Sequence, residues 1–364
     1  MIGKTVWQTI RQYYGKYERY LPVVSFLAGF LWDSLTLNRI DRLSDNVILL
    51  AYLLLAGVAI VFIHLIDHHR LTHPTIMRFR EWYPWVLQFL FGGLFSSYVV
   101  FYFQSVSMNQ SVIFFLLLVL LLVGNEFLER RLDNLFLQMA LFTFSAFSFF
   151  IFFIPVVVRR MSWWTVLLAV GFTLGLVVSI LGIMHRKQAY QSPYTLRKVA
   201  GTSIAVLSFL ILFYMLNWIP PVPLSLKFGG VYHRVQRQGE QYILTYQQPP
   251  WYQFWIKYDK QFYYQPGDTV FCFTAVFAPT LLNTKIYHHW QYWDARQERW
   301  VTTDRRGFAL TGGREKGYRG YTYKRHIRPG RWRVDVENQM GQVVGRIPFE
   351  VVVGQPQKFN FIMF

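Results

Sequence analysis

The sequence predicts a polytopic α-helical membrane bundle of about seven spans, followed by an all-β, immunoglobulin-like antiparallel sandwich. Two observations support this division. The chain of 364 residues is 53% hydrophobic and 19% aromatic, which is more apolar than a soluble domain of this length requires. The apolar runs stop at Trp218-Ile219-Pro220-Pro221, beyond which short alternating segments dominate. Because proline cannot continue a helix, we expect the last span to end at this joint.

Seven apolar runs form the predicted bundle, judged by their length and their scarcity of charge. They are Leu21–Leu37, Asn46–Leu65, Tyr83–Phe103, Ser111–Gly124, Leu135–Val158, Trp164–Met184 and Val199–Trp218. The first run contains Asp33, so a segment that turns back without crossing is the alternative there. Residues 1–20 lack a cleavable signal peptide, so we expect the first run to serve as an uncleaved anchor.

The distribution of positive charge predicts the orientation of the bundle. The short segments on one side of the predicted spans carry 13 lysines and arginines, and those on the other side carry 4. By the positive-inside rule, residues 1–20 lie in the cytoplasm, the bundle at 21–218 crosses a bacterial inner membrane, and the C-terminal domain is periplasmic. The net charge of +18 is shared by both halves, and no nucleic-acid motif accompanies it, so we expect no nucleic-acid partner.

Polar and small residues inside the bundle have packing roles as their first explanation. Gln138, Thr143, Ser145 and Ser148 are expected to make interhelical hydrogen bonds. Gly171, Gly175 and Gly182 form a small-residue face that predicts close helix contact.

A histidine and acid cluster at the cytoplasmic ends of the helices raises a functional alternative. His64, Asp67 and His68 project from one helical face at metal-ligand spacing, and Glu126 and Glu129 end another span on the same side. They are first interpreted as residues that cap helix ends. The alternative is a membrane-embedded enzyme or transporter that uses these five side chains, with His64, Asp67 and His68 as the metal ligands.

Residues 219–266 are predicted to hold a linker, a β-hairpin and an aromatic amphipathic segment. The hairpin joins Val231–Val235 to Tyr242–Tyr246 through Gln238-Gly239-Glu240. After Pro249-Pro250, aromatic residues recur at helical steps, which predicts a short helix. They are Trp251, Trp255, Tyr258 and Phe262. Packing on the β domain is the expected use of this stripe, and the membrane interface or sugar rings are the alternatives.

Residues 267–354 carry the signals of short strands separated by turns. Alternating runs recur at short intervals, with turns at Pro329-Gly330 and at Asn338–Gly341. Seven to nine such strands predict the sandwich. Cys272, the single cysteine, is expected to be a buried hydrophobic residue on one of these strands.

The run from about Asp268 to Val353 resembles the bacterial domain of unknown function 2914. The resemblance rests on the His289-Trp290 pair, on the late strand Gly330-Arg331-Trp332-Arg333-Val334, and on Phe349-Glu350-Val351 in the closing strand. The preceding helices resemble the membrane part found with this domain in some proteobacterial inner-membrane proteins. The family implies an architecture and no activity.

Arginines and exposed apolar groups supply the predicted binding residues. The β domain is rich in arginine, and the tail at 355–364 is strongly apolar and is expected to dock on the sandwich, on the membrane or on another subunit. The predicted binding residues are Arg319, Arg325, Arg328, Arg331, Arg333, Trp251, Trp255, Phe361 and Phe364.

No catalytic constellation emerges from the β domain, so the sequence predicts a non-enzymatic envelope protein without a cofactor. Its expected partners are membrane lipids, a protein partner or a second copy of the chain, and an anionic envelope polymer.

Overall fold

The computed structural model describes residues 42–78, 80, 82–103, 105, 112–127, 134–190, 192–220, 223–280, 282–314, 316–355 and 358–364. The chain divides into two compact units. Leu116–Phe149 and Phe172–Ser208 belong to the first unit, and Phe150–Gly171 and Phe209–Phe364 belong to the second. The predicted first span, Leu21–Leu37, lies outside the described residues.

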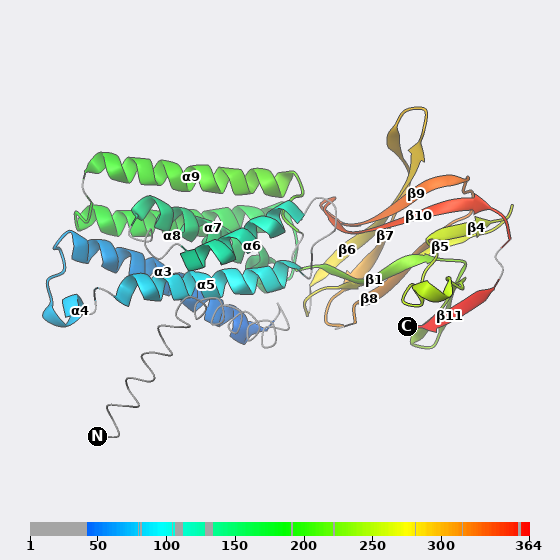
Figure 1. The fold of residues 1–364 in the computed structure, drawn as a ribbon, viewed down its shortest axis with the longest axis horizontal. Helices are drawn as coiled ribbons and strands as arrows, with labels where there is room; N and C mark the ends of the chain where they lie inside the picture. The colour runs from blue at the N-terminus through cyan, green and yellow to red at the C-terminus, as the bar shows by residue number, and fades with distance from the viewer. Residues whose placement is uncertain are drawn as a thin grey trace, which may run out of the picture. The chain divides into compact units, whose positions relative to one another are not determined.

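Five described helices are long and apolar enough to cross a membrane: α3 (Leu43–Asp67), α5 (Trp82–Phe103), α7 (Leu135–Val158), α8 (Trp163–Arg186) and α9 (Pro193–Met215). They match five of the predicted runs and appear as long coils in Figure 1. The predicted fourth span corresponds to α6 (Val112–Phe127), which has 16 residues where a straight crossing takes about 20. A short helix, α4 (Pro74–Arg78), follows α3.

The last helix ends before the prolines that were expected to stop it. Asn217 adopts a left-handed conformation with φ 59°. The amide of Asn217 donates to the carbonyl of Tyr214 at 3.1 Å, and the amide of Trp218 donates to the carbonyl of Phe213 at 2.9 Å. This is a Schellman motif, and the Phe213 and Trp218 rings complete its apolar contact with centroids 4.7 Å apart. The helix therefore ends at Met215, and Pro220 only prevents its resumption.

Hydrogen bonds between helices hold the first unit together. His64 on α3 bonds Gln138 on α7 with Nε2 and Oε1 2.9 Å apart, which confirms the predicted interhelical role of Gln138. Tyr98 on α5 donates its hydroxyl to the carbonyl of Ser145 at 2.9 Å. Thr143 instead donates to the carbonyl of Met139 on its own helix. α7 is the central helix, because 78% of its most apolar window is buried.

The small-residue face of α8 does not make the close contact that was predicted. A Cβ atom built on Gly171, Gly175 or Gly182 would meet no described atom within 4 Å. Close approaches occur elsewhere: a Cβ on Gly57 of α3 would lie 3.2 Å from both Phe142 and Ile180, and a Cβ on Gly93 of α5 would lie 2.7 Å from Tyr52. The spacing of glycines along one helix cannot reveal whether a neighbouring helix covers that face.

The second unit contains eleven described strands in three sheets. The five-stranded sheet has the order β4-β10-β9-β6-β7, the middle sheet has β1-β5-β8, and the tail sheet has β11-β3-β2. The strands are β1 (Ser225–Tyr232), β2 (Arg234–Gln238), β3 (Gln241–Gln247), β4 (Gln261–Tyr264), β5 (Val270–Phe277), β6 (Asn283–Asp294), β7 (Arg299–Thr311), β8 (Tyr318–Lys324), β9 (Gly330–Asn338), β10 (Val343–Val353) and β11 (Phe359–Met363). All pairs are antiparallel except β4 with β10, which is parallel.

The middle sheet is buried on both faces, so the domain has three layers. Val270 and Cys272 on β5 pack with Trp290 and Trp332 of the five-stranded sheet in one core. Phe273 points to the opposite side, where it packs with Leu244 of the tail sheet. Figure 1 shows β1 and β5 between the β9–β10 pair and β11. The burial of Cys272 on a strand was predicted correctly, whereas the third layer was not predicted.

The hairpin and the tail account for that third layer. β2 and β3 pair with Arg234 opposite Thr245 at one end and Gln238 opposite Gln241 at the other. Gly239 and Glu240 are left as a two-residue turn, in which Gly239 has φ 59°. The apolar tail then adds β11 to the free edge of β3, with Phe359 opposite Gln247 at one end and Met363 opposite Ile243 at the other. The predicted docking of the tail is thus on the β domain itself.

Candidate functional site

The described members of the predicted histidine and acid cluster, His64, Asp67 and His68, have separate partners. His64 contacts Gln138, and His68 bonds with Nδ1 to the carbonyl of His64 at 2.9 Å. Asp67 accepts from Arg80 at 2.6 Å. Among the described residues no group of three His, Cys, Asp or Glu side chains has an arrangement that would hold a metal ion. Glu129 and the side chain of Glu126 lie outside the described part of the chain.

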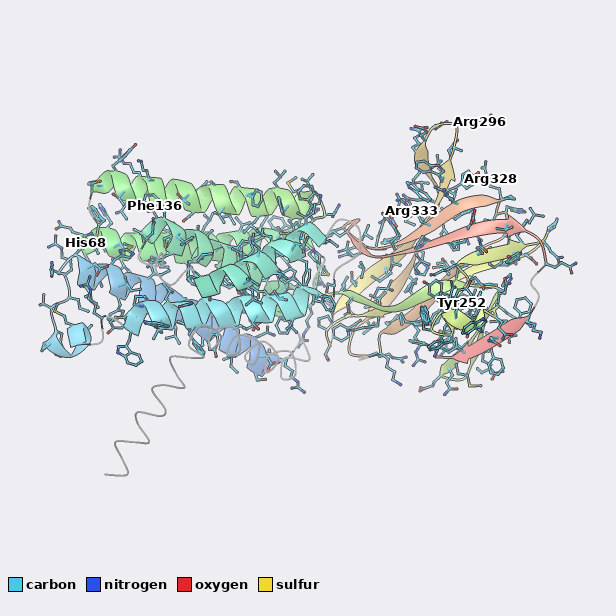
Figure 2. The ribbon with its side chains drawn as sticks, viewed as in Figure 1. His68, Phe136, Tyr252, Arg296, Arg328 and Arg333 are labelled. Carbon is cyan, nitrogen blue, oxygen red and sulfur yellow. The ribbon has the colours of Figure 1, made fainter. Side chains whose placement is uncertain are left out.

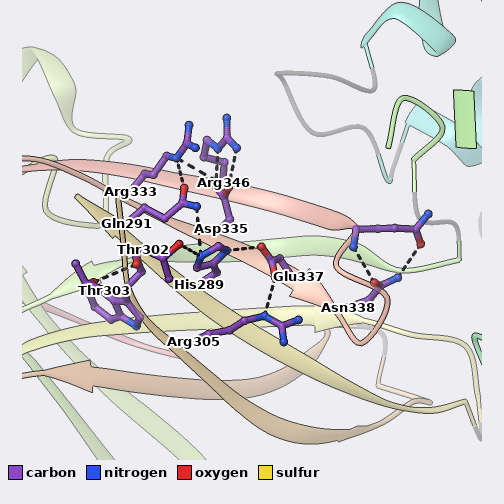
Figure 3. Close-up of polar contacts among 12 residues, drawn as sticks. His289, Gln291, Thr302, Thr303, Arg305, Arg333, Asp335, Glu337, Asn338 and Arg346 are labelled. Atoms are coloured by element: carbon purple, nitrogen blue, oxygen red, sulfur yellow. Dashed lines mark hydrogen bonds and ion pairs between the residues drawn. The ribbon is translucent and has the colours of Figure 1, made fainter. Parts of the chain in front are cut away.

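The outer face of the five-stranded sheet carries a continuous polar network across four strands (Figure 3). Asp335 on β9 receives a two-point contact from Arg346 on β10, at 2.5 Å from Nε and 2.7 Å from Nη2. On the other side of β9, Arg333 donates from Nε to Oε1 of Gln291 on β6 at 2.5 Å. Glu337 accepts from Arg305 on β7 at 3.0 Å. Each carboxylate therefore has a guanidinium partner from another strand: Asp335 from the adjacent β10, and Glu337 from β7, which lies beyond β6.

His289 joins the two halves of this network. Its Nδ1 lies 2.6 Å from Oε1 of Glu337, and its Nε2 lies 2.7 Å from the hydroxyl of Thr302 and 3.3 Å from Nε2 of Gln291. A carboxylate can only accept, so Nδ1 carries the hydrogen in this arrangement, and Nε2 accepts from the hydroxyl and the amide. The network fixes one orientation of the ring.

Two arginines of the network also stack on aromatic rings of the same face. The guanidinium of Arg305 lies 4.0 Å from the centre of the Tyr287 ring, and that of Arg333 lies 4.3 Å from the Trp300 ring. Tyr287 reaches over β7 because its strand partner is Gly307, where a Cβ would lie 2.6 Å from the ring. Asp335 is only 3% exposed and Glu337 only 7%. The side chains of this face therefore hold one another in place, and its acids, Asp335 and Glu337, already have cationic partners.

Other arginines of the domain have no carboxylate partner among the described residues, although Arg325 and Arg328 stack on the rings of Tyr323 and Tyr292. Arg296, Arg325, Arg328 and Arg331 are exposed, and none of them lies within ion-pair distance of a carboxylate among the described residues. Arg296 lies in the β6–β7 turn, Arg325 and Arg328 lie between β8 and β9, and Arg331 lies at the start of β9. We call these four residues the arginine end. Figure 2 shows Arg296, Arg328 and Arg333 on one side of the domain, with Tyr252 on the opposite side.

The structure thus splits the arginines that were predicted to bind. Arg325, Arg328 and Arg331 lie at the arginine end, and Arg333 belongs to the network beside it. Arg319 lies elsewhere, donating to the carbonyl of Glu240 at 2.6 Å and stacking over the Phe364 ring at 5.5 Å. Phe364 in turn stacks on Phe228 with centroids 4.6 Å apart, so this predicted binding residue is a core contact of the tail.

The aromatic segment after Pro250 is a loop and not the helix that was predicted. Residues Trp251–Gln253 form one 3₁₀ turn, and Phe262 is buried in β4. The expected packing of the stripe is wrong for Trp251, which is 88% exposed, and for Trp255, which is 63% exposed. Helical spacing was misleading because Tyr258 and Phe262 serve the cores on either side of the middle sheet.

Three buried ionisable groups link the sheets. His288 on β6 contacts Thr274 at 2.8 Å and Thr322 at 2.9 Å, both on the middle sheet, and burial lowers its pKa to about 3. Burial also lowers the pKa of His233 to about 4 and raises that of Asp259 well above its usual range. His233 and Asp259 lie 3.8 Å apart. Since burial disfavours charge on both, we describe this contact as neutral at pH 7 rather than as an ion pair.

We predict that acid destabilises the β domain through His288. The unfolded chain binds a proton near pH 6.5 that the folded domain excludes until about pH 3, so stability present above pH 6.5 is lost as the pH falls. The loss is about 1.4 kcal/mol per pH unit in this window. Urea unfolding of the parent chain and of His288→Gln, compared across this range, should show a smaller pH dependence in the variant.

The exposed residue His326 supplies the control for this prediction. His326→Gln should keep the pH dependence of the parent chain, because it changes an exposed side chain and leaves the buried contacts of His288 with Thr274 and Thr322 in place. Comparing each variant with the parent at every pH cancels the opposite contribution of Asp259, whose folded form keeps its proton. Equal pH dependence in the parent chain and in His288→Gln would contradict the assignment.

Comparison with known proteins identifies the C-terminal region. Residues 283–351 match the DUF2914 family, described as a protein of unknown function. The DUF2914 match begins at the start of β6 and ends within β10, so it contains the whole polar network. It excludes the aromatic loop and β11. The resemblance predicted from the sequence is thereby confirmed.

No curated protein matches the chain. Among solved structures, two β-glucosidases from Listeria innocua, in complex with laminaribiose and with gluconolactone, are 15% and 14% identical, each with a TM-score of 0.19. They cover 33% and 34% of this chain, which spans only 17% of each of them. The DNA glycosylase AlkC from Pseudomonas fluorescens, bound to DNA with an abasic site analog, is 10% identical over 78% of this chain and 83% of its own, also with a TM-score of 0.19. TM-scores of this size do not support a shared fold.

Sequence reasoning missed the network although one signal was present. Arg333, Asp335 and Glu337 alternate with buried Val334 and Val336, which predicts a charged outer face. The pairing of β9 with β10 and β6 then brings Arg346 and His289 opposite Asp335. That register depends on long-range strand order, which alternation within one strand does not encode.

Proposed function

We propose that this chain is a non-enzymatic binding protein of the bacterial inner membrane, whose periplasmic β domain holds an anionic partner. In this proposal the N-terminus is cytoplasmic, and seven spans include Leu21–Leu37 and the short α6. The five-stranded and middle sheets form the immunoglobulin-like part. The charge asymmetry of the connecting segments and the five long apolar helices support this arrangement.

The single observation that supports binding is the arginine end. Four exposed guanidinium groups at this end form no ion pair among the described residues, although Glu350 is the strand partner of Arg331 and Asp294 and Glu298 flank Arg296 along the chain. Unpaired guanidinium groups attract carboxylate and phosphate, which they can bind at two points. An acidic protein surface or an anionic envelope polymer fits this chemistry. The residues His64, Asp67 and His68 have packing and ion-pair partners, so no observation favours the enzyme or transporter alternative.

We expect Arg328→Gln with Arg331→Gln to weaken binding to a polyanion. Full-length protein in detergent, titrated with heparin as a probe, should lose affinity by about three- to tenfold, because two exposed charge contacts are removed. Added salt should lower the heparin affinity of the parent chain more than that of the variant, since screening acts on the charge contacts that the variant lacks.

A matched pair of cations elsewhere on the domain serves as the control. Arg314 and Lys316 are exposed on the segment between β7 and β8, so changing both to glutamine removes the same net charge. This control variant should bind heparin more tightly than the Arg328 and Arg331 variant. Equal losses in both variants would show a response to net charge alone and would sink the arginine end as a site.

A further inference from the structure

Two neighbouring segments of the β domain expose several large apolar side chains. The aromatic loop, residues Trp251–Trp255, lies beside β11, because the amide of Gln248 donates to the carbonyl of Lys358 at 2.9 Å and Phe359 pairs with Gln247. The exposed members are Trp251, Tyr252, Phe254, Trp255, Phe359, Phe361 and Met363. Their exposure ranges from 50% at Phe359 to 88% at Trp251. A soluble surface of this kind marks an interaction site.

The charges on these two segments are almost all positive. Lys257, Lys260 and Lys358 are exposed. The only acid in residues 247–264 and 358–364 is Asp259, whose side chain is fully buried and whose pKa is raised by burial. The neighbouring strand β10 adds one exposed carboxylate, Glu350. The apolar set is therefore flanked by cations that a negative surface would attract.

A polar pocket of about 740 Å³ opens between the aromatic loop and the tail. Lys260 and Lys358 line it, together with Tyr252, Tyr258 and Tyr263 and with four glutamines at 247, 248, 253 and 261. Ammonium, phenol and amide groups are all hydrogen-bond donors. The pocket lies within the range of volumes that small-molecule sites occupy and is large enough for a phospholipid headgroup.

Asp259 and Gln247 hold polar atoms at the pocket that lack a hydrogen-bond partner among the described residues, although Oδ2 of Asp259 lies 3.8 Å from Nε2 of His233. Oδ1 of Asp259 accepts from the amide of Gln247 at 2.7 Å, which fixes the side chain. Oδ2 of Asp259 and Oε1 of Gln247 are buried without a hydrogen-bond partner among the described residues, and both residues line the pocket. Buried polar atoms are normally satisfied, so these two atoms point to a bound polar group.

We propose that the aromatic loop and β11 dock on a lipid bilayer that contains anionic phospholipid. The tryptophan and phenylalanine rings enter the interface, the three lysines face the headgroups, and the pocket takes one headgroup. A bilayer is the favoured occupant because five helices of this chain are suited to one, so a lipid surface accompanies the protein. This docking surface lies outside the DUF2914 match and is separate from the arginine end.

A fluorescent probe at Phe254 tests this docking. Phe254→Cys, labelled with an environment-sensitive dye, would be studied in the full-length protein held in nanodiscs of phosphatidylcholine. Cys272 is fully buried and should stay unlabelled in the parent chain. Vesicles containing phosphatidylglycerol should shift the emission to the blue and shield the dye from a soluble quencher. Vesicles of phosphatidylcholine alone should have a much smaller effect.

Two comparisons fix the interpretation of the probe. Ala309→Cys, labelled in the same way on β7 outside both the docking surface and the arginine end, should stay exposed to water with every vesicle. Lys260→Gln and Lys358→Gln should each weaken the response to anionic vesicles by about fivefold. The Arg314→Gln and Lys316→Gln variant should keep the full response, because these cations lie outside the surface.

Three results would overturn the proposal. A dye at position 254 that stays exposed with anionic vesicles, and also in nanodiscs made with phosphatidylglycerol, would exclude docking on either bilayer. A response to a soluble polysaccharide without a response to vesicles would assign the rings to sugar stacking. Equal weakening by the lysine variants and by the Arg314 and Lys316 variant would show attraction through net charge alone.

Discussion

Replacing Phe273 by alanine is expected to lower the free energy of unfolding of the β domain by about 3–5 kcal/mol. Phe273 is fully buried on the face of β5 that turns away from the five-stranded sheet. Its ring packs against Tyr242 at 5.3 Å and Phe364 at 5.5 Å, between centroids, so both the hairpin and the tail depend on it. Urea unfolding of the full-length protein, followed by near-ultraviolet circular dichroism, measures the loss.

A second aromatic residue on the middle sheet provides the control for Phe273. Tyr323 on β8 is 40% exposed, so Tyr323→Ala should cost much less than Phe273→Ala. In a two-layer sandwich the residue at position 273 would face solvent, and its replacement by alanine would be nearly neutral. A small loss in Phe273→Ala would therefore contradict the three-layer arrangement.

Replacing Asp335 by alanine is expected to cost about 2–4 kcal/mol. The change leaves the partly buried guanidinium of Arg346 without its two-point partner, and it removes the nearest carboxylate of Arg333. Most of the cost is the loss of a counter-ion by a cation that stays partly desolvated. Urea unfolding under the same conditions measures it.

A double-mutant cycle separates this cost from lost packing. Adding Arg346→Met to Asp335→Ala removes the unpaired cation, so the double variant should be more stable than Asp335→Ala alone. The polar network explains that recovery, since its energy lies in the pairing and not in either residue. A double variant that is less stable than Asp335→Ala by the full cost of Arg346→Met would show two independent sites.

The sequence was most informative where periodicity is long and strong. The runs at Leu135–Val158 and Trp164–Met184 correspond to α7 and α8 within two residues at each end, because twenty apolar residues leave few alternatives to a buried helix. The end of α9 was less predictable. Asn217 stops that helix by adopting a left-handed conformation, and a single asparagine in a chain carries a weaker signal than the prolines that follow it.

The β domain was predictable strand by strand and unpredictable between strands. Alternation placed Trp332, Val334 and Val336 correctly in the core. The near-continuous apolar run in β5, by contrast, is typical of a strand that is covered on both faces, and it was taken for ordinary alternation. Recognising the third layer would have required the pairing of β11 with β3, a contact between residues more than a hundred positions apart.

The candidate sites divide in the same way. Arginine content predicted the arginine end, because exposed charge is a property of composition. The proposed lipid-docking surface depends on the contact between Gln248, just before the aromatic loop, and Lys358 in the tail, and the spacing of aromatics within the loop suggested a helix instead. Sites that depend on contacts between distant segments therefore cannot be predicted from the pattern within one segment.

The placement of the β domain outside the cytoplasm is tested most directly by labelling Arg296→Cys with a membrane-impermeant thiol reagent. Position 296 is exposed at the tip of the β6–β7 hairpin, and the native Cys272 is fully buried and serves as the unlabelled control. We predict labelling in cells whose inner membrane is intact, at the level found after that membrane is opened. Labelling that appears only after the membrane is opened would place the domain in the cytosol and contradict the proposed function.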